Sequence, residues 1–188
     1  MALLTVATVI SRVPQASSAD PTILSDVISE AQSLADGACG RTLETTAYTE
    51  YHDIGSEQET VCLRQSPITG TPVVYSDANT TAPTTLVADT DYVLDTTAGI
   101  LTTLGDSFPS GPRNLKVTYT AGYTSVTLPA GLRRVLLQVV GWILESAGNS
   151  GATSEAQDGY NVNYETIRAG LPDSLWNALQ PWRKVVLG

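Results

Sequence analysis

Histidine is almost absent from this chain of 188 residues, and His52 is the only one. Zinc sites built on several histidines and the paired-histidine motif of metalloproteases are therefore excluded. A Ser–His–Asp triad would have to use His52, but the sequence has no G-x-S-x-G turn to carry the serine. The phosphate-binding patterns G-x-x-x-x-G-K-[ST] and G-x-G-x-x-G are also missing. Nothing singles out a catalytic pair among the acidic residues. We expect a structural role for His52, and a protein with no catalytic residue, metal or cofactor.

Basic side chains are also few. Ten lysines and arginines stand against 19 acidic residues, and the net charge is −9. A nucleic-acid-binding surface needs clustered Lys and Arg to neutralise phosphates, so this composition argues against one. The same composition is compatible with the wall of a channel through which DNA slides without binding. The acidity could also serve only to keep the protein soluble, and the composition does not separate these two interpretations.

Cysteines and long apolar runs are scarce as well. Cys39 and Cys62 lack the spacing of a metal site, and we expect both to be free, buried thiols in a reducing cytoplasm. No apolar run approaches the roughly 20 residues that a membrane span requires. The N-terminal stretch MALLTVATVISRV lacks a basic region and is interrupted by Arg12, unlike a signal peptide. We expect a soluble, unexported protein with no membrane partner.

The sequence does contain helical patterns towards both ends. Apolar residues recur at helical spacing in 5–13, which predicts a short helix followed by a linker at 14–20. The sequence further predicts an α+β fold, with helices at about 21–38, 129–146 and 172–180 and an antiparallel β region at about 45–120. We expect a single domain, 1–188, with a C-terminal tail at 181–188.

The middle of the chain is rich in threonine and alternates with period 2, which is typical of strands. The candidate strands are 46–53, 60–64, 72–76, 84–87, 91–95, 100–104 and 114–120. The segment from Asp95 to Gly99 predicts a hairpin turn. Residues 77–84 predict an exposed hairpin tip or a longer projecting arm. Further on, 147–160 predicts a mobile polar loop, and 160–167 a short strand.

The helix expected at 129–146 is apolar around much of its circumference. We expect one side to pack within its own domain and the other, with Leu137 and Val140, to meet a neighbouring subunit. The alternative is a helix that is simply central to its own domain. Arg133 and Arg134 lie near the helix start, where the helix dipole disfavours cations. We predict that these arginines are structural or interfacial, that carboxylates are their partners, and that they do not bind DNA.

The C-terminal segment concentrates interface-type residues after Pro181. Trp and Arg dominate interface hot spots, and an extended apolar tail can add a strand to a neighbouring sheet. We predict that the tail docks on a partner; the alternative is a tail folded back on its own domain. The candidate residues are Trp182, Arg183, Val185, Val186 and Leu187.

In order along the chain, several motifs carry a family resemblance. They are ILSDVISEAQSLADGACGR at 23–41, D-Y-V-L-D-x-x-x-G-I-L at 91–101, RNLKVTYTAGY at 113–123, LPAGLRRVLLQVVGWILE at 128–145 and LPDSLWNALQPWR at 171–183. Together, from residue 20 to near the end, the chain resembles the head–tail connector (adaptor, or head-completion) proteins of long-tailed bacteriophages. The β region here is longer and richer in threonine than in compact, nearly all-helical relatives, so the docking residues do not carry over.

The resemblance implies that the helices form a bundle and that the β-rich region at 42–120 is an insertion within it. It also implies a virion protein of the phage neck, assembled in the host cytoplasm. It implies a homo-oligomeric ring of about twelve copies that joins the portal protein to the next neck protein, a stopper or tail terminator. Genomic DNA would pass through the lumen without specific binding. In that setting the portal is the expected partner of the C-terminal tail.

Two other classes of function stay open at this point. A β-rich tail or receptor-binding module would require 42–120 to form an independent sandwich, with the helices as mere attachments. A small hydrolase would require His52 or a pair of carboxylates to line a deep pocket. The oligomeric state would distinguish the three classes. A ring would support the connector, a trimer the tail module, and a monomer with a pocket the hydrolase.

Overall fold

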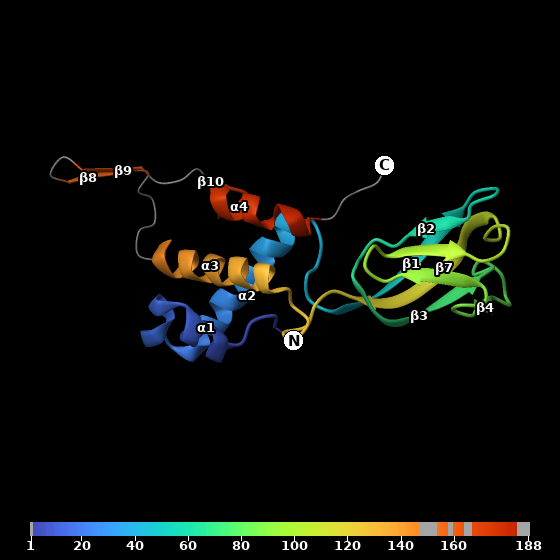
Figure 1. Ribbon diagram of the computed structural model, residues 1–188, viewed down its shortest axis with the longest axis horizontal. Helices are drawn as coiled ribbons and strands as arrows, with labels where there is room; N and C mark the ends of the chain where they lie inside the picture. The colour runs from blue at the N-terminus through green and yellow to red at the C-terminus, as the bar shows by residue number, and fades with distance from the viewer. Residues whose placement is uncertain (1, 147–153, 158–159, 164–166, 184–188) are drawn as a thin grey trace. The chain divides into compact units, whose positions relative to one another are not determined.

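The computed structural model describes residues 2–146, 154–157, 160–163 and 167–183 (Figure 1). The chain divides into two compact units. The helical unit is Met1–Leu43 with Thr124–Gly188, and the strand unit is Glu44–Tyr123. The helical unit contains α1 (Val6–Arg12), the 3-10 helix η1 (Pro14–Ser18), α2 (Pro21–Cys39), α3 (Ala130–Ser146), β8 (Ser154–Gln157), β9 (Tyr160–Asn163), β10 (Ile167–Arg168), β11 (Leu171–Pro172), α4 (Asp173–Leu179) and the 3-10 helix η2 (Gln180–Trp182).

Local sequence explains both ends of α2. The Asp20 side chain accepts a hydrogen bond from the backbone N–H of Thr22, and Pro21 takes the first helical position, where no N–H is needed. At the other end Gly40 adopts the left-handed conformation with φ of 64°, which costs glycine little. The helix predicted at 21–38 is therefore confirmed. Its buried stripe consists of Leu24, Ile28, Ala31, Ala35, Ala38 and Cys39.

The helix α3 confirms the prediction for 129–146 and packs on α2, η1 and α4. Its buried face is formed by Leu132, Val135, Leu136, Val139, Val140 and Ile143. Val140 is 0% exposed, so the expectation that it meets a neighbouring subunit is corrected. It follows Leu136 by one helical turn and therefore shares the face that packs into the unit's own core.

The segments around these helices differ in part from the expectation. The helix predicted at 5–13 is confirmed as α1, but the predicted linker at 14–20 contains η1, in which Ala16 is fully buried. The helix predicted at 172–180 is confirmed as α4. Within the loop predicted at 147–160, β8 pairs with β9; the remainder of that loop and residues 164–166 lie outside the described residues.

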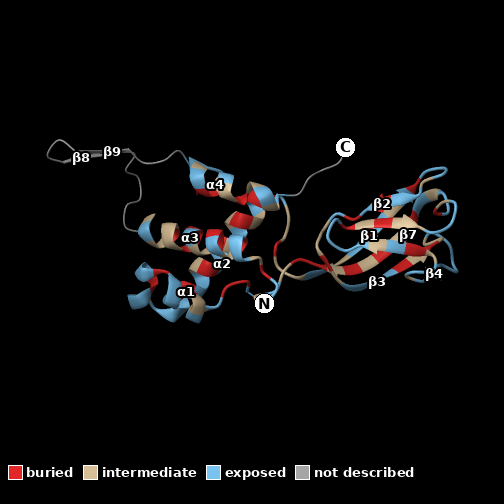
Figure 2. Cartoon of the chain, in the orientation of Figure 1, coloured by how far each residue is buried: buried red, intermediate tan, exposed pale blue. Residues whose placement is uncertain are grey.

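The strand unit is built from two antiparallel sheets. One has the order β1-β7-β3-β4 and the other β2-β6-β5. The strands are β1 (Thr46–Ile54), β2 (Thr60–Cys62), β3 (Ile68–Ser76), β4 (Thr84–Leu86), β5 (Tyr92–Asp95), β6 (Ile100–Thr103) and β7 (Gly111–Ala121). Buried side chains from both sheets and from the connection between β6 and β7 form one core. It includes Val61, Val74, Leu101, Leu115 and Val117 from the sheets and Phe108 from that connection. Figure 2 shows buried residues along the strands of this unit, so the β region has a core of its own.

Every predicted strand is present in the strand unit. The turn at Asp95–Gly99 joins β5 to β6 as predicted, with the Asp95 carboxylate accepting bonds from the N–H groups of Thr97 and Ala98. Residues 77–83 connect the paired strands β3 and β4 and so form a hairpin tip. β3 starts four residues earlier than predicted, because its pairing with β7 continues across a register irregularity between Thr69 and Val73.

Cys62 is exposed, which corrects the expectation that both thiols are buried. Its neighbours Val61 and Leu63 face the core, so Cys62 must point to the other side of the strand. Within the described residues, no helix combines the length and apolarity needed to cross a bilayer.

Candidate functional site: a groove on the helical unit

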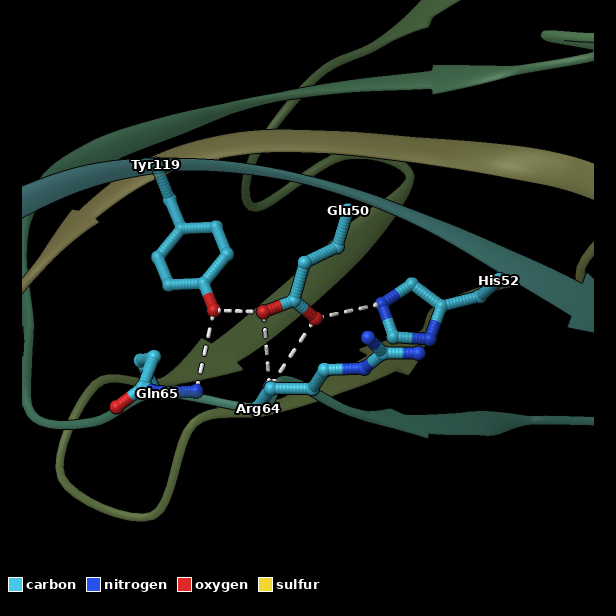
Figure 3. Close-up of polar contacts among 5 residues, drawn as sticks. All are labelled: Glu50, His52, Arg64, Gln65 and Tyr119. Carbon is cyan, nitrogen blue, oxygen red and sulfur yellow. Dashed lines mark hydrogen bonds and ion pairs between the residues drawn. The ribbon is translucent and has the colours of Figure 1, made fainter. Parts of the chain in front are cut away.

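In the strand unit, the buried Glu50 is the centre of a polar network with His52, Arg64, Gln65 and Tyr119 (Figure 3). Glu50 is only 8% exposed, and its carboxylate accepts a hydrogen bond from the hydroxyl of Tyr119. The backbone N–H of Arg64 donates to both carboxylate oxygens, at 3.2 Å to Oε1 and 3.1 Å to Oε2. Nε2 of His52 lies 3.2 Å from Oε2 of Glu50. The Tyr119 oxygen also accepts a bond from the N–H of Gln65 at 3.1 Å.

This environment changes the acidity of both groups. Burial of Glu50 raises its pKa, but the contact with His52 and the hydrogen bonds from Tyr119 and the Arg64 N–H outweigh that effect, so the net pKa is lowered. Burial, followed by the hydrogen bond to Glu50, raises the pKa of Tyr119. An ionised Glu50 that accepts bonds from a neutral Tyr119 ties the segment after β2 to strands β1 and β7. The arrangement fits the structural role predicted for His52.

A groove of about 770 Å³ opens on the helical unit. One wall is the end of α1 and the start of η1, and the opposite wall belongs to α3, with the start of α4 at one side. The α3 residues recur every three or four positions and therefore lie along one face of that helix. The lining residues include Arg12, Val13, Gln15, Ala130, Arg133, Arg134, Leu137, Gln138, Gly141, Trp142, Glu145, Pro172 and Leu175.

Specific contacts hold the walls of this groove. Gln15 donates a hydrogen bond to the Glu145 carboxylate and so ties η1 to the end of α3. Val13, the residue between α1 and η1, packs against α3 at Gly141, where a Cβ would lie 3.6 Å from one of its methyl carbons. Arg133 donates through Nη2 to the backbone oxygen of Ser125 at 2.9 Å, which fixes the loop before α3.

The groove joins apolar and basic groups on an acidic protein. Arg12, Arg133 and Arg134 line it, three of the ten basic residues of the chain, beside the single acid Glu145. Leu137, Trp142 and Leu175 supply apolar surface. Such a surface suits a partner that carries carboxylates next to an apolar side chain.

The candidate residues from the sequence fall into separate places. Arg133, Arg134 and Leu137 meet in the groove, whereas Val140 is buried behind it. The described partner of Arg133 is a backbone carbonyl, which differs from the predicted carboxylate. Arg12, which the sequence analysis did not single out for binding, is a further member. Its basic charge is visible in the sequence, but its place opposite α3 depends on how α1 packs.

The C-terminal candidates lie apart from the groove lining. A Cβ at Gly131 would lie 3.1 Å from two ring atoms of Trp182, so the half-buried Trp182 ring packs directly on the first turn of α3. Trp182 therefore contacts its own unit, as in the alternative of a tail folded back. Arg183 is exposed, and Val185, Val186 and Leu187 lie outside the described residues.

No protein-family model and no curated protein matches the sequence. Solved structures do share the fold. A chain in the neck of an empty gene transfer agent (GTA) particle, computed with C6 symmetry, is 18% identical with a TM-score of 0.58, covering 91% of this chain and 83% of that one. A chain in the virion of a native GTA particle is 19% identical, also with a TM-score of 0.58, covering 91% and 82%.

A third similar chain lies in the neck of a native GTA particle computed with C12 symmetry. It is 16% identical with a TM-score of 0.57, covering 88% of this chain and 85% of that one. At these identities the likeness shows the fold. That fold is α+β, it spans both units, and it agrees with the resemblance to head–tail connector proteins. These three solved chains are components of the neck or virion of a GTA particle.

Proposed function

We propose that this protein is a structural component of the neck of a phage-like particle and acts as a ring of identical subunits. The observation that carries the proposal is the likeness to neck chains over about nine-tenths of the sequence, with both units included. Particle necks computed with C6 and C12 symmetry contain the similar chains. Those symmetries support a ring with a multiple of six copies, and the proposed number is about twelve.

Within this proposal, the ring acts as a connector between the head and the tail of the particle. The ring joins the portal of a DNA-filled head to the next neck protein, a stopper or tail terminator, in head completion. DNA passes through its lumen during ejection, and the assembly forms in the host cytoplasm before it becomes part of the virion. The net charge of −9 supports a lumen that does not hold DNA. In this proposal the strand unit is an insertion within one connector domain, and the tail from residue 181 contacts the portal.

The test is the state of the purified full chain, measured by native mass spectrometry and negative-stain imaging. We expect closed rings of about twelve copies. A trimer would favour a tail or receptor-binding module, for which the separate core of the strand unit is the supporting observation. A monomer at all concentrations would contradict the ring.

A further inference from the structure

We propose that the groove binds the exposed acidic face of α2 from a second copy of this chain. The proposal rests on the proposed function, because it supplies the contact between neighbouring subunits of the ring. The acidic face is defined as Ile23, Asp26 and Glu30, all of which are exposed.

The acidic face carries two carboxylates beside an exposed apolar side chain, whereas the groove is mainly basic and apolar. Ile23 is 56% exposed, although it is a large apolar residue, and Asp26 and Glu30 follow it at helical spacing on the same side. Between Ile23 and Glu30 the helix rises about 10 Å. An apolar side chain beside two carboxylates therefore occupies a short stretch of one helix.

The rest of this helix permits a close approach. α2 contains acidic residues but no basic one, so no like charge opposes the arginines of the groove. The exposed positions beside the acidic face are small side chains, Thr22, Ser25, Ser29 and Ser33. A groove wall can come near a helix with such a surface without displacing long side chains.

The groove supplies the complementary chemistry. Arg12 and Arg134 are exposed at its rim, and Leu137 and Trp142 offer apolar surface to an inserted isoleucine. Charge complementarity of this kind fixes register and excludes wrong partners. A duplex DNA would meet the same arginines, but the remainder of the chain carries a large excess of negative charge.

The two surfaces also satisfy the geometry of a ring. The residues that line the groove come from α1, η1, β11, α3 and α4, so each subunit presents the groove and the α2 face as two different surfaces. A contact between two different surfaces is head-to-tail, and it continues from subunit to subunit until the rotation closes.

Charge reversal tests the contact. The groove variant carries Arg12→Glu with Arg134→Glu, and the helix variant carries Asp26→Arg with Glu30→Arg. Arg133 is left unchanged because it holds the loop at Ser125. In each variant alone, like charges face each other, and we expect association about a hundredfold weaker than in the wild type. Circular dichroism and thermal unfolding check that both variants are folded.

Mixing the two variants is the decisive step. The reversed groove then meets the reversed helix, and the native groove meets the native helix, so alternating rings should form. The mixed association should weaken as salt rises, because exposed charges are screened. A matched control, Glu59→Arg with Asp106→Arg, makes the same change of charge as the helix variant at exposed sites of the strand unit and should assemble like the wild type.

The outcomes separate this inference from the proposed function. Wild-type rings together with unimpaired assembly of either variant would overturn the α2–groove contact and leave the ring standing. Wild-type rings with no recovery on mixing would overturn it as well. Pairing of the two variants in sedimentation, without closed rings of any form, would support the contact and contradict the ring. Binding of duplex DNA by the wild type that the groove variant loses would assign the groove to nucleic acid and overturn the inference.

Discussion

Glu50 shows how one buried acid can fix the conformation of a loop. Its carboxylate accepts bonds from Tyr119 and from the Arg64 N–H, and its low exposure keeps competing water away. In Glu50→Gln, an amide N–H would replace one carboxylate oxygen and would face groups that now donate hydrogen bonds to that oxygen. We expect a loss of about 1–3 kcal/mol in the free energy of unfolding at neutral pH, since a buried donor is left unsatisfied.

The lowered pKa of Glu50 gives this loss a pH dependence. A folded-state pKa below the unfolded value means that the unfolded chain binds more protons, so stability rises with pH in that range. The contribution is complete above the unfolded value of about 4.5 and is lost as the pH falls through the lower, folded value. Chemical unfolding between pH 3 and 7 should therefore be less pH-dependent in Glu50→Gln. The exposed Glu59→Gln is the control, and an unchanged pH slope in Glu50→Gln would contradict the assignment.

The two thiols should differ strongly in reactivity. Cys39 is buried, its sulfur lies 3.9 Å from the backbone oxygen of Leu179, and burial raises the pKa of its thiol to about 11. Cys62 is exposed. Because the thiolate is the reactive form, one thiol per chain should react rapidly with Ellman's reagent at pH 8 and the other only on unfolding. Cys62→Ser should remove the rapid phase and Cys39→Ser should retain it; rapid reaction in Cys62→Ser would show that Cys39 is accessible.

At the scale of elements, α3 serves two surfaces at once. Its inner face is central to the helical unit, and its outer face is a wall of the groove. Val139 is fully buried on the inner face, so Val139→Asp would bury an unpaired carboxylate. We expect a loss of several kcal/mol, enough to unfold a domain of ordinary stability. The adjacent Gln138 is exposed, and Gln138→Asp should change the melting temperature little. A folded, ring-forming Val139→Asp protein would contradict the central position of α3.

The sequence predicted the elements whose ends are set locally. Asp20, Pro21 and Gly40 define α2 through capping that needs no distant contact, and Asp95 does the same for the turn before β6. The early start of β3 was missed because Gly70 and Pro72 interrupt the alternation, whereas pairing with β7 carries the strand across them. The exposure of Cys62 could have been predicted, since Val61 and Leu63 alternate with it.

The groove was predicted only in part, for a different physical reason. Arg133, Arg134 and Leu137 lie on one side of α3, and helical periodicity places them there. Arg12 reaches the same site because α1 and η1 pack against α3 through Val13 and Gly141, a tertiary contact that no local pattern encodes. Val140 was expected to contact a neighbouring subunit. Helical spacing predicts that its apolar side chain is covered, but it does not distinguish a partner in the same chain from one in another subunit.

At the scale of the whole molecule, the chain enters and leaves the strand unit at one point. Glu44 and Tyr123 are bridged, and the N–H of Thr45 donates to the Tyr123 oxygen at 2.9 Å. An element whose two ends lie side by side can be inserted into another without disturbing the connection. Because each unit also has its own buried core, the organisation supports two units that fold without each other's contacts.

Separating the units tests this organisation. We expect the fragment Glu44–Tyr123, about 80 residues, to unfold cooperatively by circular dichroism and calorimetry, since a chain of that length can bury a core. Replacing the same segment in the full chain by a short glycine-rich linker should leave a helical protein with its own transition. Phe108→Ala is the control for a native core in the fragment. Phe108 is almost fully buried, and its truncation should cost about 3–5 kcal/mol and lower the transition temperature. A fragment with no cooperative transition, or with one that Phe108→Ala leaves unchanged, would show that the strand unit depends on the helical unit for its structure.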